Sequence, residues 1–303
     1  MCCLFGLHNY KNTLSRVQKS QLVSELSIAA EARGTDATGV SYNVDGKTVI
    51  YKRPLPAHLM WFRIPKDSPV VMGHTRMTTQ GNEGFNCNNH PFPGTAGERA
   101  FALAHNGTIW NDKLLRTQWG IPAAKVETDS YIAVQMLEQA GGISFDSLGF
   151  VAEKLEGSFT LSVLSDRNEL FFVKGDNPLC IYHYEKLGLY VYASTEAILK
   201  KAVKAVPFKL GHFTKVNLVS GDILKIDEKG ERSKSSFDDR KLYSNSWRPF
   251  FDFPDLDPIY SDDEYLSDLK AVASSCGYCD EDVDYMLANG FTTDDIEEML
   301  YCG

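Results

Sequence analysis

The sequence predicts an α+β fold in which antiparallel β-sheets are covered by helices. Three observations indicate this class: signals for β-hairpins follow one another closely, helical patterns are grouped between them, and the composition is typical of a packed chain. Of the 303 residues, 43% are hydrophobic, 12% aromatic and 23% charged, which excludes a disordered or fibrous protein. Helices that are grouped, and do not alternate with single strands, disfavour a doubly wound parallel sheet.

The first half of the chain begins with a helical pattern and continues with β-rich stretches. Apolar residues recur at helical spacing over residues 14–33, and Gly34 stands where a helix C-terminus favours glycine. Asp45 and Gly46 mark a turn within a β-rich stretch at residues 40–51. Further strands are predicted at residues 69–73 and 100–109, and further helices at residues 128–137 and 145–155.

Three hairpins are predicted in the second half of the chain. Each joins two runs rich in β-branched and aromatic residues through a short stretch containing Gly, Asn or Asp. They span residues 159–173 with a turn at 166–168, residues 180–192 with a turn near Gly188, and residues 213–226 with a turn at 220–222. Hairpin pairing makes the predicted sheets antiparallel.

The distribution of charge separates a body from an acidic tail. From Asp252 onward there are 15 acidic residues and one basic residue, Lys270, whereas the preceding part carries a net charge of +5, for a total of -9. The sequence therefore predicts a body at residues 2–235, a linker or strap at 236–260, and a small acidic helical module at 261–303. Helices within this module are predicted at residues 262–273, 281–288 and 293–301.

Composition also excludes several classes of partner. The body has no clustered run of Lys or Arg and the tail is acidic, so we expect no nucleic-acid binding. No stretch approaches the length of apolar sequence that spans a bilayer, so no membrane association is expected. Seven cysteines at irregular spacing favour reduced thiols and a cytoplasmic protein. Cys276 and Cys279 have the spacing of half a zinc site, but no second pair follows, and no metal is predicted.

The N-terminus contains a candidate nucleophile. Cysteine is small enough for Met1 to be removed before it, and removal would leave Cys2 with both a thiol and a free α-amine. An α-amine has a pKa of about 7.7 to 8.0, so it can accept the thiol proton near neutral pH. A cysteine at the second position is more often coincidental, so this interpretation depends on complementary groups further along the chain.

Three downstream segments supply such groups. Arg76 can hold an α-carboxylate through two parallel N–H bonds, and Asp129 can hold an α-ammonium group, so the pair would recognise a free amino acid. Asn106 and Gly107 offer a side-chain amide and a backbone N–H, which together can stabilise the oxyanion formed when a thiolate attacks an amide.

The order of these segments resembles that of the class II glutamine amidotransferases, and in particular the glucosamine-phosphate synthase and phosphoribosyl-pyrophosphate amidotransferase branches. The likeness extends over about residues 2–200. Six motifs carry it, at residues 2–6, 33–40, 73–81, 89–91, 105–111 and 127–129. The resemblance implies a four-layer α/β/β/α body of the N-terminal-nucleophile hydrolase type, followed here by the small helical C-terminal tail.

The resemblance also implies the reaction and the residues that perform it. Cys2 would be the nucleophile, Asn106 and Gly107 the oxyanion hole, and Arg76, Thr79 and Asp129 the glutamine-binding residues. Glutamine would be hydrolysed to glutamate and ammonia through a thioester intermediate, with no metal or organic cofactor.

The sequence departs from the family in two respects. Cys3 stands where the family usually has glycine, Met77 replaces an aromatic residue, and Gln80 occupies a position where one branch has histidine. The residues after the body are too few to build the acceptor domain of family enzymes. Three alternatives therefore stay open: ammonia delivery to a separate acceptor (synthase) protein, hydrolysis of another γ-glutamyl amide, or a non-catalytic interaction protein. A retained Met1, detected by intact mass, would favour the last.

Overall fold

The computed structural model describes residues 2–242 and, in the C-terminal part, residues 266, 269–270, 273–274, 278–288, 291, 293, 296 and 299. The chain divides into two compact units, Met1–Arg248 and Pro249–Gly303. The division lies inside the linker predicted at residues 236–260. Each unit is considered by itself.

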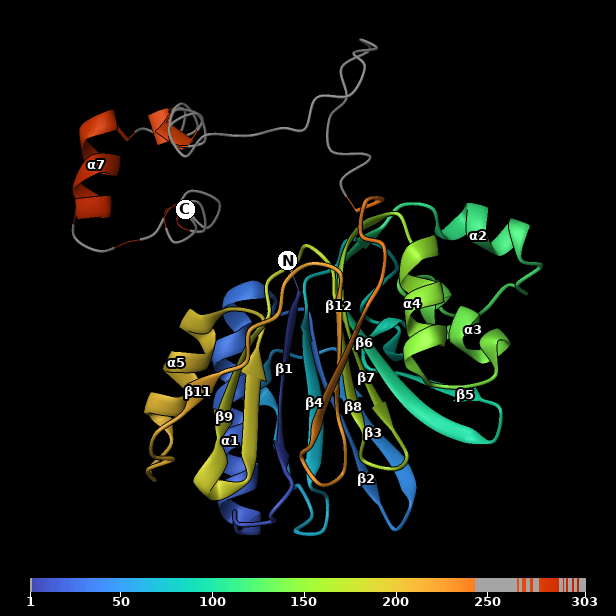
Figure 1. The fold of residues 1–303 in the computed structure, drawn as a ribbon, viewed down its shortest axis with the longest axis horizontal. Coiled ribbons are helices and arrows are strands. Elements are labelled where there is room, and N and C mark those ends of the chain that lie inside the picture. Colours follow the sequence, from blue (N-terminus) through green and yellow to red (C-terminus); the bar gives the residue numbers. More distant parts are fainter. Residues whose placement is uncertain are drawn as a thin grey trace. The chain divides into compact units, whose positions relative to one another are not determined.

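Two antiparallel sheets form the centre of the first unit (Figure 1). The seven-stranded sheet has the order β11-β9-β10-β1-β4-β2-β3, and its strands are β1 (Cys3–Asn9), β2 (Ala37–Val44), β3 (Lys47–Arg53), β4 (Val70–Arg76), β9 (Cys180–Tyr184), β10 (Leu189–Ala193) and β11 (Thr214–Lys215). The six-stranded sheet has the order β13-β12-β8-β7-β6-β5, and its strands are β5 (Phe92–Ala96), β6 (Arg99–Ile109), β7 (Gly157–Ser165), β8 (Leu170–Lys174), β12 (Asp222–Ile226) and β13 (Arg232–Ser236). The strand that follows Cys2, β1, is thus an interior strand of its sheet.

The hairpin predicted at residues 213–226 is wrong. Its first run forms β11, which pairs with β9 in the seven-stranded sheet, whereas its second run forms β12, which pairs with β8 and β13 in the other sheet. The segment between them crosses from one sheet to the other. A turn signal specifies a reversal of the chain, but it does not specify that the flanking strands pair with each other.

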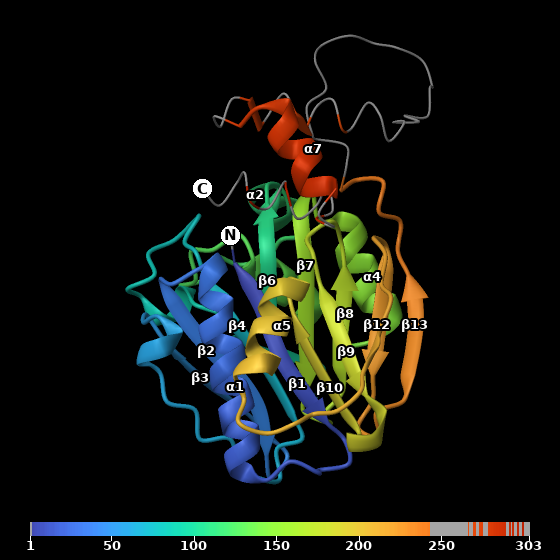
Figure 2. The same cartoon turned by 90° about the vertical axis from the view of Figure 1, so that its left-hand side faces the viewer.

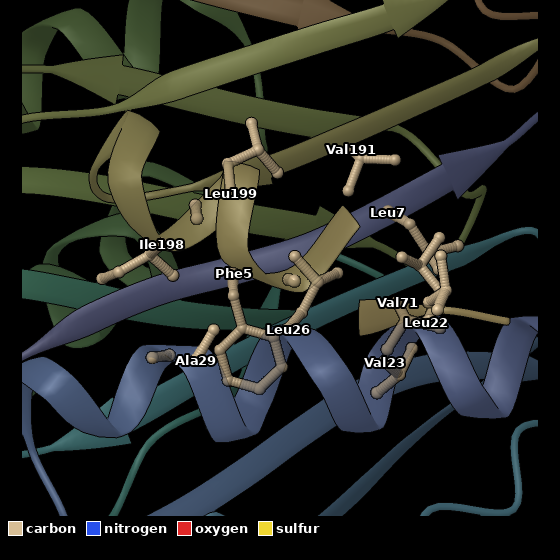
Figure 3. Packing of buried hydrophobic residues seen from close by; sticks show 14 of the residues in the cluster. Phe5, Leu7, Leu22, Val23, Leu26, Ala29, Val71, Val191, Ile198 and Leu199 are labelled. Atoms are coloured by element: carbon tan, nitrogen blue, oxygen red, sulfur yellow. The ribbon is translucent and has the colours of Figure 1, made fainter. Parts of the chain in front are cut away.

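Two helices cover the outer face of the seven-stranded sheet, α1 (Arg16–Ala30) and α5 (Glu196–Ala205) (Figure 2). Ser15 begins α1 with a capping box, since its side chain accepts from the Gln18 N–H and the Gln18 side chain accepts from the Ser15 N–H. Figure 3 shows the apolar face of α1 against this sheet. Its buried side chains pack on strands β1, β4 and β10 and on α5: Phe5, Leu7, Leu22, Val23, Leu26, Ala29, Val71, Val191, Ile198 and Leu199.

The remaining helices of this unit lie beside the six-stranded sheet. They are α2 (Asp112–Gln118), α3 (Tyr131–Ala140) and α4 (Phe145–Lys154), and α3 and α4 contribute most of the buried apolar residues on this side. A third apolar cluster, which includes Leu4, Met72 and Leu164, fills the space between the two sheets. The succession is helices, sheet, sheet, helices. The predicted four-layer α/β/β/α body is therefore confirmed.

The second unit has a small apolar core of its own. Leu269, Ala273, Val283 and Ile296 are buried together, with Leu266, Met286 and Leu287 packed against them. Helix α7 (Asp280–Ala288) corresponds to the helix predicted at residues 281–288. Most of the helices predicted at residues 262–273 and 293–301, and most of the predicted linker, lie outside the described residues.

Candidate active site

Cys2 immediately precedes β1, where the strand pairing places it beside the end of β4. Cys3 lies opposite Thr75, and the Cys2 thiol lies 3.5 Å from the carbonyl oxygen of Met77. The Cys2 carbonyl accepts a hydrogen bond from Arg33 Nε at 3.0 Å. Cys2 is half-buried, whereas Cys3 is fully buried in the core beneath α1. Met1 lies outside the described residues.

The surroundings of the Cys2 thiol keep it protonated at neutral pH. Burial raises its pKa, the positive charge of Arg76 lowers it, and the negative charge of Asp129 raises it again. Both charged residues predicted to bind substrate are therefore close enough to act on the predicted nucleophile. A thiol in this state needs a base before it can attack.

Residues 33–40, one of the six motifs, support the end of β4. A Cβ on Gly34 would lie 2.5 Å from the backbone carbon of Arg76, so only glycine fits there. The Asp36 N–H donates to the Arg76 carbonyl at 3.0 Å, and the Asp36 carboxylate accepts from the Thr78 N–H at 2.7 Å. The motif thus fixes the backbone on both sides of Met77, whose carbonyl faces the thiol.

Arg76 ends β4 with a buried side chain that organises the following loop. Its Nη1 donates to Asn89 Oδ1 at 2.7 Å, and its Nη2 donates to the carbonyls of Gln80 at 2.5 Å and Gly81 at 3.4 Å. A guanidinium group has five N–H donors, so these three bonds do not exhaust it. Arg76 thus has a second task that the sequence did not indicate, since it holds the loop at residues 77–89 in place.

Thr79 lies in this loop with an exposed side chain, as does Met77, which is 51% exposed. The two residues lie on the solvent side of the carbonyl that faces the Cys2 thiol. The predicted contact of Thr79 with glutamine therefore requires substrate to enter from this exposed side.

Asp129 precedes α3 and is held by two hydrogen bonds. Its Oδ2 accepts from the Ile109 N–H at 2.6 Å, and its Oδ1 accepts from Ser130 Oγ at 3.3 Å. Ser130 Oγ lies 2.7 Å from Nδ1 of His105. The carboxylate is thus attached to β6 at Ile109 directly and at His105 through Ser130, so its orientation is coupled to the strand that carries the predicted oxyanion hole.

Asn106 and Gly107 are consecutive residues of β6. Asn106 is fully buried, its Nδ2 donates to Ser194 Oγ at 3.4 Å, and its Oδ1 has no hydrogen-bond partner in the described part of the chain. Gly107 has φ of 134°, and a Cβ there would lie 1.9 Å from the Ser158 carbonyl oxygen. Glycine is therefore required at this position by both conformation and space.

Three buried histidines lie behind the site. The His90 and His74 ring centroids are 4.2 Å apart, those of His90 and His105 are 6.4 Å apart, and His74 Nε2 lies 2.9 Å from the His105 carbonyl. Burial lowers the pKa of all three, that of His74 to about 3, so the rings are neutral. Within the described residues no group of three His, Cys, Asp or Glu side chains could hold a metal ion.

The structure therefore brings Cys2, Arg76 and Asp129 together and connects Asn106 to the strand of the nucleophile. Sequence reasoning missed four supporting residues, namely Arg33, Asn89, Ser130 and Ser194. The first three lie in or beside the six motifs and could have been suspected from that position. Ser194 lies outside them, and nothing in the local sequence marks it.

Curated sequences related to this chain are named glutamine–fructose-6-phosphate aminotransferase [isomerizing]. The protein of that name from Staphylococcus aureus is 30% identical over 193 residues, which cover 60% of this chain and 30% of the relative. The one from Sulfolobus acidocaldarius is 29% identical over 234 residues, which cover 73% of this chain and 38% of the relative. The chain thus spans about a third of the length of these relatives. No protein-family model matches it.

Solved structures share the fold. The glutamine phosphoribosylpyrophosphate amidotransferase of B. subtilis, in complex with ADP and GMP, superposes with a TM-score of 0.60 at 18% identity, covering 78% of this chain and 49% of that one. A structure described as the allosteric regulatory enzyme of purine biosynthesis gives a TM-score of 0.61 at 19% identity over the same shares. Across the described residues no helix is both long and apolar enough to cross a membrane.

Proposed function

The body of this chain is related to the glutaminase domains of class II glutamine amidotransferases, as its motifs indicated, and we propose that it hydrolyses the side-chain amide of glutamine to glutamate and ammonia. The observation that carries this proposal is the convergence of Arg76 and Asp129, two opposite charges, on the thiol of Cys2. A carboxylate and a guanidinium at one thiol match the ammonium and carboxylate groups of a free amino acid.

The proposed reaction begins after removal of Met1. The α-amine of Cys2 accepts the thiol proton, and the thiolate attacks the side-chain amide carbon of glutamine. The oxyanion of the tetrahedral intermediate is stabilised by Nδ2 of Asn106 and by the backbone N–H of Gly107. The α-ammonium returns its proton to the amide nitrogen, the C–N bond breaks, and ammonia departs. Water then hydrolyses the γ-glutamyl thioester, which releases glutamate and restores the thiol.

Substrate recognition in this proposal depends on the charged ends of glutamine. Arg76 binds the α-carboxylate, Asp129 binds the α-ammonium, and the exposed Thr79 hydroxyl contacts substrate at the loop. The hydrogen bonds that anchor both charged side chains support these roles, since a preorganised group loses less entropy on binding.

The test is release of ammonia and glutamate by the purified chain, with its N-terminal residue established by intact mass. We expect turnover of free glutamine, and poor turnover when the α-amine is acylated or the α-carboxylate is amidated. Preference for a larger γ-glutamyl amide would replace this function by hydrolysis of that amide. A chain that retains Met1 and shows no turnover would favour a non-catalytic interaction protein.

We place the acceptor of ammonia on another polypeptide. The relatives are named as aminotransferases and are about three times as long as the matched region, whereas the second unit here has only a small core around Val283. The described cysteines are free thiols, which supports a reducing compartment such as the cytoplasm: Cys2, Cys3, Cys87, Cys180 and Cys279. No cofactor enters the proposed reaction.

Arg76→Lys is expected to lower kcat/KM for glutamine at least about tenfold, or roughly 1.4 kcal/mol. Lysine keeps the charge but loses the planar fork, and it cannot make the bonds to both Asn89 and the Gln80 carbonyl, so the melting temperature should also fall. The matched control is Arg99→Lys, because Arg99 also bonds carboxylates but lies at the opposite end of β6 from Asn106. Equal losses in both variants would contradict the assignment.

Truncation after Pro258 is expected to leave glutaminase activity unchanged and the melting temperature of the body within about 2 °C, since the second unit packs around its own apolar core. We propose that this acidic module recruits the acceptor protein, so truncation should also remove any co-purifying partner. Calorimetry, activity and pull-down from the native source check the three expectations. A truncated body that aggregates would show that the module belongs to the core fold.

A further inference from the structure

We propose that Ser194 is a positioning residue that orients the Asn106 amide toward the oxyanion. The proposal rests on the proposed function, because it concerns how the same site is aligned. Ser194 follows β10, lies outside the six motifs and is fully buried. No role in the reaction follows from its place in the sequence, and only its contacts suggest one.

Ser194 is attached to the strand of the nucleophile by two hydrogen bonds. Its N–H donates to the Leu4 carbonyl at 2.9 Å, and its Oγ accepts from the Leu4 N–H at 2.9 Å. Leu4 is only two residues from Cys2 and is fully buried. The backbone bond continues the pairing of β1 with β10, in which Phe5 lies opposite Ala193. The Ser194 hydroxyl is therefore fixed relative to the backbone that carries the thiol.

The same hydroxyl reaches the other sheet. Ser194 Oγ accepts a hydrogen bond from Nδ2 of Asn106 at 3.4 Å, and Asn106 belongs to β6 of the six-stranded sheet. One oxygen atom thus bonds to the nucleophile strand on one side and to the predicted oxyanion donor on the other. This contact is a direct route by which the two halves of the site are held in register.

The chemistry of the amide explains why this contact matters. Nδ2 carries two N–H groups, so it can donate one to Ser194 and present the other to the oxyanion. The opposite atom, Oδ1, has no hydrogen-bond partner in the described residues, so nothing there holds the amide in this orientation. A rotation of 180° about the last side-chain bond would direct Oδ1 at the oxyanion, where a carbonyl repels the developing charge. The bond to Ser194 opposes that rotation.

The experiment compares Ser194→Ala, which removes the hydroxyl, with Ser194→Thr, which keeps it. We expect Ser194→Ala to lower kcat by roughly 10- to 100-fold, less than or comparable to the loss of an oxyanion donor itself, with KM within about twofold. Ser194→Thr should recover most of the loss. Ser162→Ala serves as the control, because Ser162 is also fully buried but lies on β7 and belongs to neither strand of the site. It should keep kcat.

Two further readouts separate positioning from a general loss of structure. Alkylation of Cys2 by iodoacetamide forms no oxyanion, so its rate should be unchanged in Ser194→Ala. In protein labelled with ¹⁵N-asparagine, the side-chain N–H signals of Asn106, identified by their absence in Asn106→Ala, should shift in Ser194→Ala and not in Ser162→Ala.

An unchanged kcat, or a fall matched by slower alkylation and a large loss of melting temperature, would overturn the proposal. If wild-type protein releases no ammonia from glutamine, the proposed function fails, and the Asn106 signals alone decide the point. A shift confined to Ser194→Ala would then support the bond that orients the amide, and unshifted signals would refute it.

Discussion

Cys2→Ala abolishes ammonia release from glutamine, with an expected loss in kcat of at least about 10⁴-fold, because no other described group lies where it could replace the thiol between Arg76 and Asp129. Cys2 is half-buried at the beginning of β1, so removing its sulfur should leave the fold intact. An ammonia assay and circular dichroism on the same preparation test both statements. Thioester should also fail to accumulate when the variant is quenched with acid during turnover.

The matched control is the neighbouring thiol. Burial raises the pKa of Cys3 to about 11, and its side chain packs in the apolar core beneath α1, so it is unreactive at neutral pH. Cys3→Ala should keep kcat and lose stability on the order of 1 kcal/mol, as small deletions in a core do. The substitution Cys3→Gly should also keep activity, at a larger cost in stability because glycine adds backbone freedom to the unfolded chain. Wild-type turnover by Cys2→Ala would refute the mechanism.

The sequence was sufficient for the class and layering of the fold. The turn at Asp45 and Gly46 and the hairpin ending near Tyr192 are local signals, and the structure pairs their strands as expected. The error at residues 213–226 came from the same kind of signal, because the Gly221 turn does not reveal that β11 and β12 belong to different sheets. Strand partners that lie far apart along the chain are set by packing, which a local pattern does not contain.

The candidate site divides in the same way. Cys2, Arg76 and Asp129 carry distinctive chemistry, so their residue types and order were enough to nominate them. Ser130 and Ser194 act through hydrogen bonds to residues that are distant in sequence or on another element, and a serine is too common to be noticed without those distances. The double role of Arg76 was also hidden, because its bonds to the loop depend on how residues 80–89 fold back.

The pairing of Asp129 with the substrate ammonium predicts that Asp129→Asn lowers kcat/KM for glutamine by at least about 100-fold, or roughly 2.7 kcal/mol. Asparagine has the same shape and its Oδ1 can still accept from the Ile109 N–H, so the change removes charge with little change in packing. The control is Asp227→Asn, because Asp227 also accepts backbone N–H groups but lies in the turn between β12 and β13. That variant should retain full activity.

A glutamine analogue that lacks the α-amine separates charge recognition from every other effect of Asp129→Asn. Wild-type enzyme should process this analogue poorly, because the buried carboxylate then has no ammonium to bind. The substitution should therefore cost little or nothing further with the analogue, although it is severe with glutamine, and the difference between the two costs measures the coupling between Asp129 and the amine. If the substitution were equally damaging with both substrates, Asp129 would act by holding β6 at Ile109 and not by binding glutamine.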